Sequence, residues 1–306
     1  AITDGLFYDF RELEAAGYIN MENDYWSPAA NEDLTIAGKT YLAINDITMS
    51  KLSWTGCLFF NPEIIDVYGL ENPQDLVDAN QWTIDKFLQA VQLISTDVDG
   101  NGTREATDTY GFAYSIWNAA DVWLSAFGQS VCKTSDAGIE MTFMNDKTVS
   151  ILDKLLSFHY DFQPFLKLST QYDEETWFTN NQLVFAPMRF QAAYTDLREM
   201  DAAYSMLPFP KWDEAQESYY SFLSPWGSCF IALPQTVAGN EDYGFLTEAL
   251  ARYSHQHVRP IAYDLVYKEK DSRDPRSVDV LNILLDCTYI DFQSLFNFGT
   301  VNDSLQ

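Results

Sequence analysis

Apolar residues recur at helical spacing in three segments of the chain. These segments follow Asp146, Asn240 and Asp274, polar residues of the kind that start helices. After Asp274, Pro275 can occupy the first helical turn. The apolar stripes consist of Ile151, Leu152, Leu155 and Leu156, of Phe245, Leu246, Ala249, Leu250 and Tyr253, and of Val278, Leu281, Leu284 and Leu285. This spacing predicts three amphipathic helices.

Short apolar runs, bounded by Gly, Pro or polar residues, lie between the helical segments. They predict strands at 40–44, 56–60, 111–114, 183–187 and 228–233. None alternates for long, and a continuous apolar run such as 229–233 suits a strand buried on both faces of a sheet. Helices that alternate with such strands predict an α/β architecture in which helices cover the sheets.

An ordered series of short motifs begins in residues 38–112 and continues towards the C-terminus. It consists of CLFFN at 57–61, PEIIDVYGL at 62–70, WTIDKF at 82–87, DVDGNG at 97–102, YGF at 110–112, QLVFAPM at 182–188 and WGSCFIALP at 226–234. Each string alone would recur in unrelated proteins, so the order and spacing carry the weight. In this order the motifs resemble family 1 extracellular solute-binding proteins, the maltose-binding-protein-like, carbohydrate-type components of bacterial ABC importers.

The resemblance implies a two-lobed, type II periplasmic-binding-protein-like fold with sheets flanked by helices and a ligand cleft between the lobes. Residues 1–53 with 225–272 would form the first lobe, and 54–224 with 273–306 the second. The chain would cross between them near 54–56, 224–227 and 273–275. Family members usually begin with a strand-helix-strand unit that would precede Ala1, so we expect the first lobe to be incomplete.

Length and charge limit the class of protein. A chain of 306 residues suits two lobes better than one core. With 45 acidic and 18 basic residues its formal charge is −27, which repels phosphate backbones and anionic membranes, so nucleic acid is excluded as a partner. The ordinary interpretation of such acidity is a well-solvated surface.

Aromatic side chains are the first candidates for ligand binding, because a flat ring packs well against the C–H face of a sugar. The chain has eight Trp. Trp54, Trp117 and Trp226 lie in turn-like segments beside predicted strands, in loops that face the cleft according to the family resemblance. The alternative for each is an ordinary core position.

Polar groups should converge on the same cleft, since sugar hydroxyls must be hydrogen-bonded once they leave water. The resemblance places Asn118 in a ligand loop, and Arg189 with Gln191 in a loop that closes on the ligand. Asp46 is a further candidate, as are Asn45 and Asp121. Each alone could be an ordinary surface residue.

Residues 97–108 follow the spacing of a calcium-binding loop. Oxygen-bearing side chains lie at Asp97, Asp99, Asn101 and Thr103, Gly102 permits the tight bend, and Asp108 supplies the last acid. Asp108 is shorter than the glutamate normally found there, and an Asp/Gly turn that joins a helix to a strand would use the same residues. Calcium is the one cofactor that the sequence suggests.

The cysteine and histidine patterns do not predict a further metal site. Cys57, Cys132, Cys229 and Cys287 are far apart, and free thiols in apolar segments, buried in the cases of Cys57 and Cys229, are preferred to disulfides. His255 and His257 form a pair without an evident third ligand, which favours a surface position at a helix C-terminus.

Two classes of function remain. The first is a non-catalytic, extracellular binding protein, a periplasmic or cell-surface monomer that closes two hinged lobes on an oligosaccharide and delivers it to ABC-transporter permease subunits. The second is a glycoside hydrolase or another carbohydrate-active enzyme, which would also use aromatic platforms and would need a carboxylate pair. The sequence contains neither G-x-S-x-G nor H-E-x-x-H.

Overall fold

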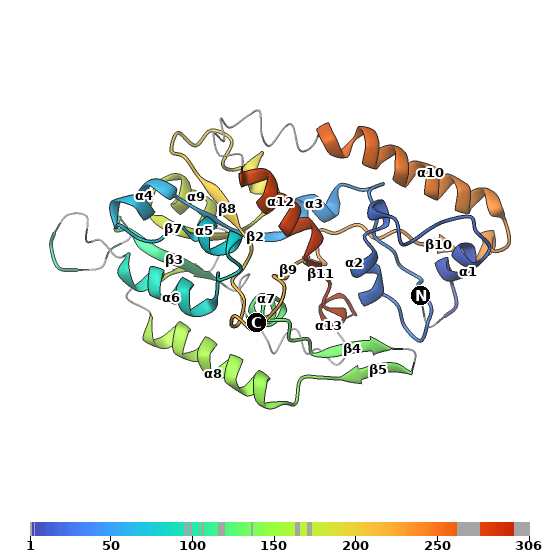
Figure 1. Ribbon diagram of the computed structural model, residues 1–306, viewed down its shortest axis with the longest axis horizontal. Coiled ribbons are helices and arrows are strands. Elements are labelled where there is room, and N and C mark those ends of the chain that lie inside the picture. The colour runs from blue at the N-terminus through green and yellow to red at the C-terminus, as the bar shows by residue number, and fades with distance from the viewer. Residues whose placement is uncertain are drawn as a thin grey trace.

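The computed structural model of the chain describes residues 2, 4–94, 97, 100–103, 105, 107–115, 120–135, 137–162, 166–169, 173–261 and 276–296. They form an elongated α/β molecule (Figure 1). A mixed sheet with its helices makes up one end, and α1 (Phe10–Ala15), α2 (Pro28–Asp33) and most of α10 (Glu241–His257) lie towards the other. Between them lie α3 (Ser50–Trp54) and α12 (Arg276–Asp286).

The main sheet has five strands in the order β6-β3-β7-β2-β8. Their bounds are Leu166–Ser169, Tyr110–Ser115, Leu183–Arg189, Gly56–Phe60 and Ser205–Leu207. Strands β6, β3 and β7 are parallel, whereas β2 is antiparallel to both of its neighbours. The carboxyl ends of the parallel strands therefore lie at the same edge of the sheet as the amino end of β2, where Gly56 pairs with Arg189.

Both faces of the sheet are covered, because strand β2 is apolar throughout. Leu58 and Phe60 pack on one face, and Cys57 and Phe59 pack on the other. The first face is covered by α4 (Pro62–Val67), α5 (Pro73–Asp78), α6 (Ile84–Leu93), α7 (Ala120–Ala126) and α8 (Asp146–Asp161), and the second by α9 (Glu174–Thr179), η4 (Phe190–Ala193) and α12. The strand predicted at 56–60 is confirmed with these bounds.

The predicted helices form where the sequence places their starts. Asn145 caps α8 by accepting a hydrogen bond from the amide of Thr148, and Asn240 caps α10 through the amide of Asp242. The third predicted helix is α12, which begins at Arg276. Asp274 and Pro275, the residues expected to start it, lie outside the described residues.

The end of the molecule around α10 has a smaller core. Strands β1 (Phe7–Tyr8) and β10 (Leu233–Pro234) pair there, and η5 (Gln235–Val237) follows β10. The Glu248 carboxylate of α10 accepts hydrogen bonds from Trp26 Nε1 at 2.6 Å and from the Tyr25 hydroxyl at 2.5 Å, in η1 (Asp24–Trp26). A polar anchor therefore joins α10 to the N-terminal segments.

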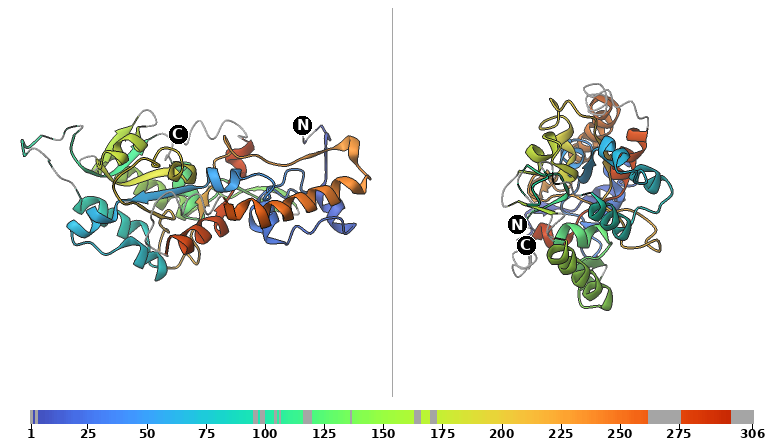
Figure 2. Two further views of the ribbon diagram at one scale, coloured as in Figure 1. Left: turned by 90° about the horizontal axis from the view of Figure 1, so that it is seen from above. Right: turned by 90° about the vertical axis from the view of Figure 1, so that its left-hand side faces the viewer.

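Helix α10 faces the core with the opposite side from the one that we expected. Its predicted apolar stripe is exposed, with Leu246 56% and Tyr253 61% accessible, whereas Gly244 and Ala251 are buried. The helix runs along the long axis at the molecular surface (Figure 2). A Cβ at Gly244 would lie 2.7 Å from Tyr18 Cβ, so the helix approaches its neighbours through small residues.

Two of the predicted strands are wrong. Residues 40–44 and 228–233 contribute a single bridge between Ala43 and Ile231, followed by the two-residue β10. Within the described residues, these two segments pair through this one bridge, so the apolar run does not form a continuous strand ladder. The strands predicted at 111–114 and 183–187 are confirmed within β3 and β7.

Three segments of chain lie side by side where the sheet meets the rest of the molecule. Thr55 forms a bridge with Leu223, and the Leu223 amide donates to the Tyr289 carbonyl at 3.0 Å. β9 (Ser221–Phe222) and β11 (Thr288–Tyr289) pair in parallel there, and β4 (Cys132–Ser135), β5 (Gly138–Met141) and α13 (Phe292–Phe296) complete the described elements. In the described part of the chain, no helix is long and apolar enough to span a bilayer.

We expect Gly111→Ala to destabilise the fold, because its Cβ would lie 2.6 Å from the Val91 carbonyl oxygen and 2.8 Å from Val91 Cα. These are backbone atoms of α6, so the helix would have to move away from β3. The unfolding free energy in urea should fall by about 2–4 kcal/mol. Adding Val91→Ala to Gly111→Ala should not restore the unfolding free energy, because the clash is with backbone atoms of Val91. An unchanged urea midpoint for Gly111→Ala would contradict the close packing.

Candidate functional site

The first place to seek a ligand is the edge of the sheet beside the adjacent segments around Thr55, Leu223 and Tyr289. These are called the crossing segments because they lie where the sheet meets the rest of the molecule. In open α/β sheets, ligands bind outside the carboxyl ends of parallel strands. Here these ends belong to β3, β6 and β7, and Arg189 is the last residue of β7. The adjacent β2 begins directly after Thr55, in the crossing. Residues at this edge therefore lie next to the other part of the molecule.

Trp54 and Arg189 form a stacked pair at this edge. The guanidinium carbon of Arg189 lies 4.4 Å from the centre of the Trp54 ring. Gly227 lies against the same indole, since a Cβ at Gly227 would be only 1.9–2.2 Å from its ring carbons. Trp226, next in the chain, is 76% exposed. The structure thus brings Trp54, Arg189 and the 226–227 segment together.

The other predicted binding residues are placed differently. Gln191 lies in η4, two residues after Arg189. Trp117 and Asn118 lie outside the described residues. Asp46 belongs to a separate cluster, where its Oδ2 lies 2.6 Å from His255 Nδ1 and 3.4 Å from Arg259 Nη1. Asn45 is buried beside it.

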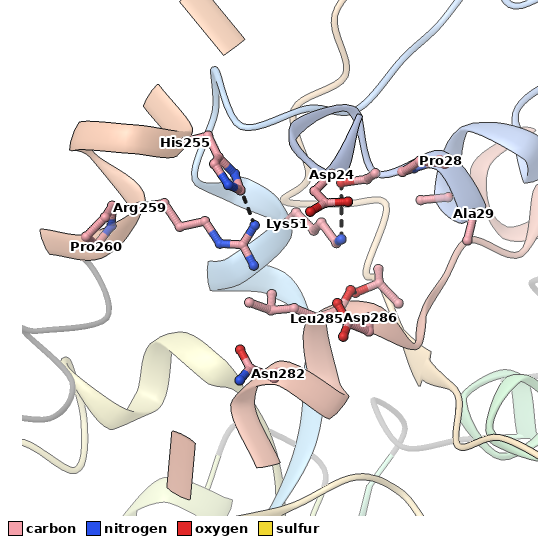
Figure 3. A pocket seen from close by; sticks show the side chains of 13 residues that line it. Asp24, Pro28, Ala29, Lys51, His255, Arg259, Pro260, Asn282, Leu285 and Asp286 are labelled. Atoms are coloured by element: carbon pink, nitrogen blue, oxygen red, sulfur yellow. Dashed lines mark hydrogen bonds between the residues drawn. The ribbon is translucent and has the colours of Figure 1, made fainter. Parts of the chain in front are cut away.

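A cavity of about 580 Å³ adjoins the Asp46 cluster (Figure 3). It lies between η1, α2, α3, α12 and the residues at the end of α10. Its lining consists of Asp24, Ser27, Pro28, Ala29, Ala30, Lys51, His255, Arg259, Pro260, Asn282, Leu285, Asp286 and Thr288. None of the predicted binding residues lines it, and sequence reasoning missed Lys51 and Arg259.

The pKa of Lys51 is lowered to about 8, chiefly by burial; Asp46 and Asp286 raise this pKa, and Arg259 lowers it. Lys51 Nζ donates to Ser27 Oγ at 3.1 Å. The lysine therefore keeps its charge at neutral pH at a cost to stability. The sequence offered one signal for a buried Lys51: it is one of few basic residues in the chain, and it lies next to an apolar residue.

A second cavity, of about 360 Å³, adjoins α2 as well and shares Ala29, Asp286 and Thr288 with the first. Asp33 and Tyr289 line it. Burial raises the pKa of Asp33 to about 7 and that of Asp121 to about 6, and it also raises the pKa of Asp291. These carboxyl groups repel one another electrostatically, since Asp291 raises the pKa of both others.

The predicted calcium loop is described only in part. Asp97 accepts hydrogen bonds from the amides of Gly100 and Gly102, and Asn101 Oδ1 accepts one from the amide of Thr103. Asp108 is buried and accepts from the amide of Glu105 at 2.8 Å. Asp99 lies outside the described residues. Among those described, no three His, Cys, Asp or Glu side chains are grouped to hold a metal, and calcium binding stays a prediction.

All four cysteines are free thiols. Cys57 and Cys132 are buried, and Cys287 is half-buried. The expectation of a buried Cys229 is wrong, because Cys229 is exposed next to the short crossing segment rather than inside a strand.

The sequence matches no protein-family model, and no curated protein matches it. Solved structures do match. The sugar-binding protein MalE from the phytopathogen Xanthomonas citri has a TM-score of 0.62 and 12% identity, over 99% of this chain and 72% of its own. An ABC substrate-binding protein from Listeria monocytogenes, in complex with cycloalternan, has a TM-score of 0.57 and 13% identity, over 94% of this chain and 70% of its own. UgpB from Mycobacterium tuberculosis, in complex with glycerophosphocholine, has a TM-score of 0.57 and 12% identity, over 99% of this chain and 74% of its own.

The chain has the fold of these solute-binding proteins. The expected two-lobed, periplasmic-binding-protein-like α/β class is therefore confirmed, and so is the resemblance at the level of fold. Identities of 12–13% between these proteins and this chain do not transfer individual site residues.

Replacing Lys51 by Met should stabilise the protein at pH 7 by about 1–2 kcal/mol, because it removes a buried charge and keeps most of the volume. Between the lowered pKa of Lys51 in the folded state, about 8, and its ordinary value of 10.5, the unfolded state binds more protons. Wild-type stability therefore rises across this window, and the advantage of Lys51→Met should shrink by pH 9.5 in urea titrations.

The exposed Lys86, which pairs with Glu71, supplies the matched control Lys86→Met. It should change stability little and show no such trend. If Lys51→Met destabilised the protein at pH 7, the burial cost assigned to Lys51 would be wrong.

Asp33→Asn should show the opposite dependence on pH. The folded-state pKa of Asp33 is raised above 3.8, so its contribution to stability is present below about pH 4 and is lost as the pH rises through 7. Thermal or urea unfolding should find the variant equal to wild type at pH 4 and more stable by about 1–2 kcal/mol at pH 8. A constant difference between these pH values would contradict the raised pKa.

Proposed function

We propose that the chain is a non-catalytic, extracellular solute-binding protein that captures a carbohydrate between two hinged lobes and delivers it to an ABC-transporter permease. The observation that carries the proposal is the Trp54–Arg189 pair, which lies at the carboxyl edge of the sheet, where the chain crosses to the other part of the molecule. An exposed indole at Trp226 is next to it. Similar folds with 12–13% identity bind a sugar or cycloalternan in other proteins, which supports this class of ligand.

The pair suits a sugar for a physical reason. The Trp54 ring offers a flat apolar surface, and the guanidinium of Arg189 offers several hydrogen-bond donors beside it. A sugar ring has matching C–H faces and hydroxyl groups. Trp117, Asn118, Gln191 and Trp226 would complete the site in this proposal. Asp46 would act at its margin.

Closure would follow from bridging contacts. The lobe boundaries proposed here are those at residues 53/54, 224/225 and 272/273. A ligand that contacts both lobes only in the closed form favours that form by its differential binding energy. Transport requires no covalent change in the ligand, which separates this function from glycoside hydrolysis. The protein would act as a monomer outside the cytoplasmic membrane.

Calorimetry with a panel of oligosaccharides tests the site. Maltotriose, maltotetraose and cycloalternan should be included, and glycerophosphocholine serves as the non-carbohydrate alternative suggested by the UgpB fold. We expect at least one glycan to bind, and Trp54→Ala to weaken it by about tenfold or more, because the stacking surface is lost.

Trp212 provides the matched control. It is a half-buried Trp beside Phe127 and Lys154, in a part of the molecule that the proposed site does not include. Trp212→Ala should leave glycan affinity within about twofold. Unchanged affinity in both Trp54→Ala and Trp226→Ala would remove the assigned site, and new reducing ends on the glycan would favour the hydrolase instead.

A further inference from the structure

The cavity beside α3 is separate from the Trp54–Arg189 pair. In the main sheet the strand order places β7, which ends at Arg189, on one side of β2, and β8 on the other. Helix α12 packs against β8 and supplies Asn282, Leu285 and Asp286 to the cavity. Neither Trp54 nor Arg189 lines the cavity, although Trp54 lies three residues after Lys51 in α3. Its volume of about 580 Å³ is sufficient for a small organic molecule.

Two basic side chains reach into this one cavity. Lys51 comes from α3 and Arg259 from the residues that follow α10, and Figure 3 shows both directed into the same space. The chain has only 18 Lys and Arg residues against 45 acidic ones, so two of them at one cavity is notable. Each positive charge destabilises the other, because Arg259 lowers the pKa of Lys51. An anionic group placed between them would relieve this repulsion.

The positions of both cations are set by neighbouring side chains. Asp46 contacts Arg259 Nη1 and His255 Nδ1, and these two also lie 3.3 Å apart. The Ser27 hydroxyl accepts from Lys51 at 3.1 Å. Within the described residues, Lys51 has no carboxylate within 4.0 Å. The lysine is thus held in place without a counter-ion in direct contact.

Acidic side chains also line the same cavity. Asp24 belongs to η1 and Asp286 to the end of α12, and both are exposed. In the described part of the chain neither forms an ion pair within 4.0 Å. The cavity is therefore lined by two cations, Lys51 and Arg259, and by the two exposed carboxylates of Asp24 and Asp286, which lie around Lys51 in Figure 3.

We propose that this cavity binds a small zwitterion, whose carboxylate or phosphate group lies between Lys51 and Arg259 and whose ammonium group faces Asp24 and Asp286. A bare anion would be repelled by a protein with a formal charge of −27 and by the two exposed carboxylates. A zwitterion reduces the long-range repulsion because its ammonium charge offsets negative charge on its carboxylate or phosphate group. This binding activity goes beyond carbohydrate capture and does not depend on it.

Two zwitterions and their matched anions test the proposal by calorimetry at pH 7. Phosphocholine is compared with inorganic phosphate, and β-alanine is compared with propionate, so the two arms show whether phosphate or carboxylate is preferred. We expect at least one zwitterion to bind at least about tenfold more tightly than its matched anion, because the ammonium adds contacts to Asp24 and Asp286.

Lys51→Met should weaken the bound zwitterion by about tenfold or more, and Asp286→Asn should weaken it while leaving the matched anion unaffected or bound more tightly. Lys86→Met should leave all affinities unchanged. Circular dichroism and thermal unfolding check that each variant is folded, which we expect for Lys51→Met since it removes a buried charge.

The proposal is overturned if neither zwitterion binds below about 10 mM, a concentration beyond which binding is too weak to be specific. It is also overturned if folded Lys51→Met binds as wild type does, or if each anion binds as tightly as its zwitterion. Loss of glycan binding in Trp54→Ala with zwitterion binding intact would support two separate sites. Zwitterion binding without any glycan binding would remove the proposed function and leave this inference in place.

Discussion

Strand β2 is the constraint on which the rest of the structure depends. It is hydrogen-bonded on both edges, to β7 and β8, and buried on both faces. A slip of one residue in its register would exchange the two buried faces, each of which is matched to its own set of helices. Because β2 begins directly after the crossing at Thr55, its register also fixes Trp54 opposite the end of β7. The stacking of Arg189 on Trp54 follows from this register.

The electrostatics of the crossing region reflect the acidic composition of the chain. Burial raises the pKa of Asp33, the last residue of α2, and the neighbouring carboxylates of Glu32 and Asp291 raise it further. Lys51, His255 and Arg259 line the larger cavity, and Asp46 pairs with the last two of them. The two cavities beside this short helix therefore both mix charges: Lys51 and Arg259 line the larger one with Asp24 and Asp286, and Asp33 lines the smaller one with Lys133.

Local signals predicted local structure well. The apolar run at 56–60 became β2 with the same bounds, and Asn240 capped α10 where the polar residues indicated a start. The prediction that the apolar stripe of α10 is the buried face was wrong. Periodicity shows that one face is apolar, but it does not show which face packs against the rest of the molecule. Close approach to Tyr18 requires Gly244, so the small residues face inwards. The order of the motifs predicted Trp54 and Arg189 as binding residues. The contact between Asp46 and His255 could not be predicted in this way, because it joins residues 209 positions apart and has no local sequence pattern.

The outward-facing stripe of α10 has a consequence for how the protein behaves in concentrated solution. Each copy has a formal net charge of −27, so adjacent copies repel one another over many ångströms at low ionic strength. Added electrolyte shortens its reach to about 8 Å at physiological ionic strength, and the exposed leucine and tyrosine side chains then become available for contact. Salt should therefore promote self-association through α10, which charge repulsion between the acidic surfaces opposes at low ionic strength.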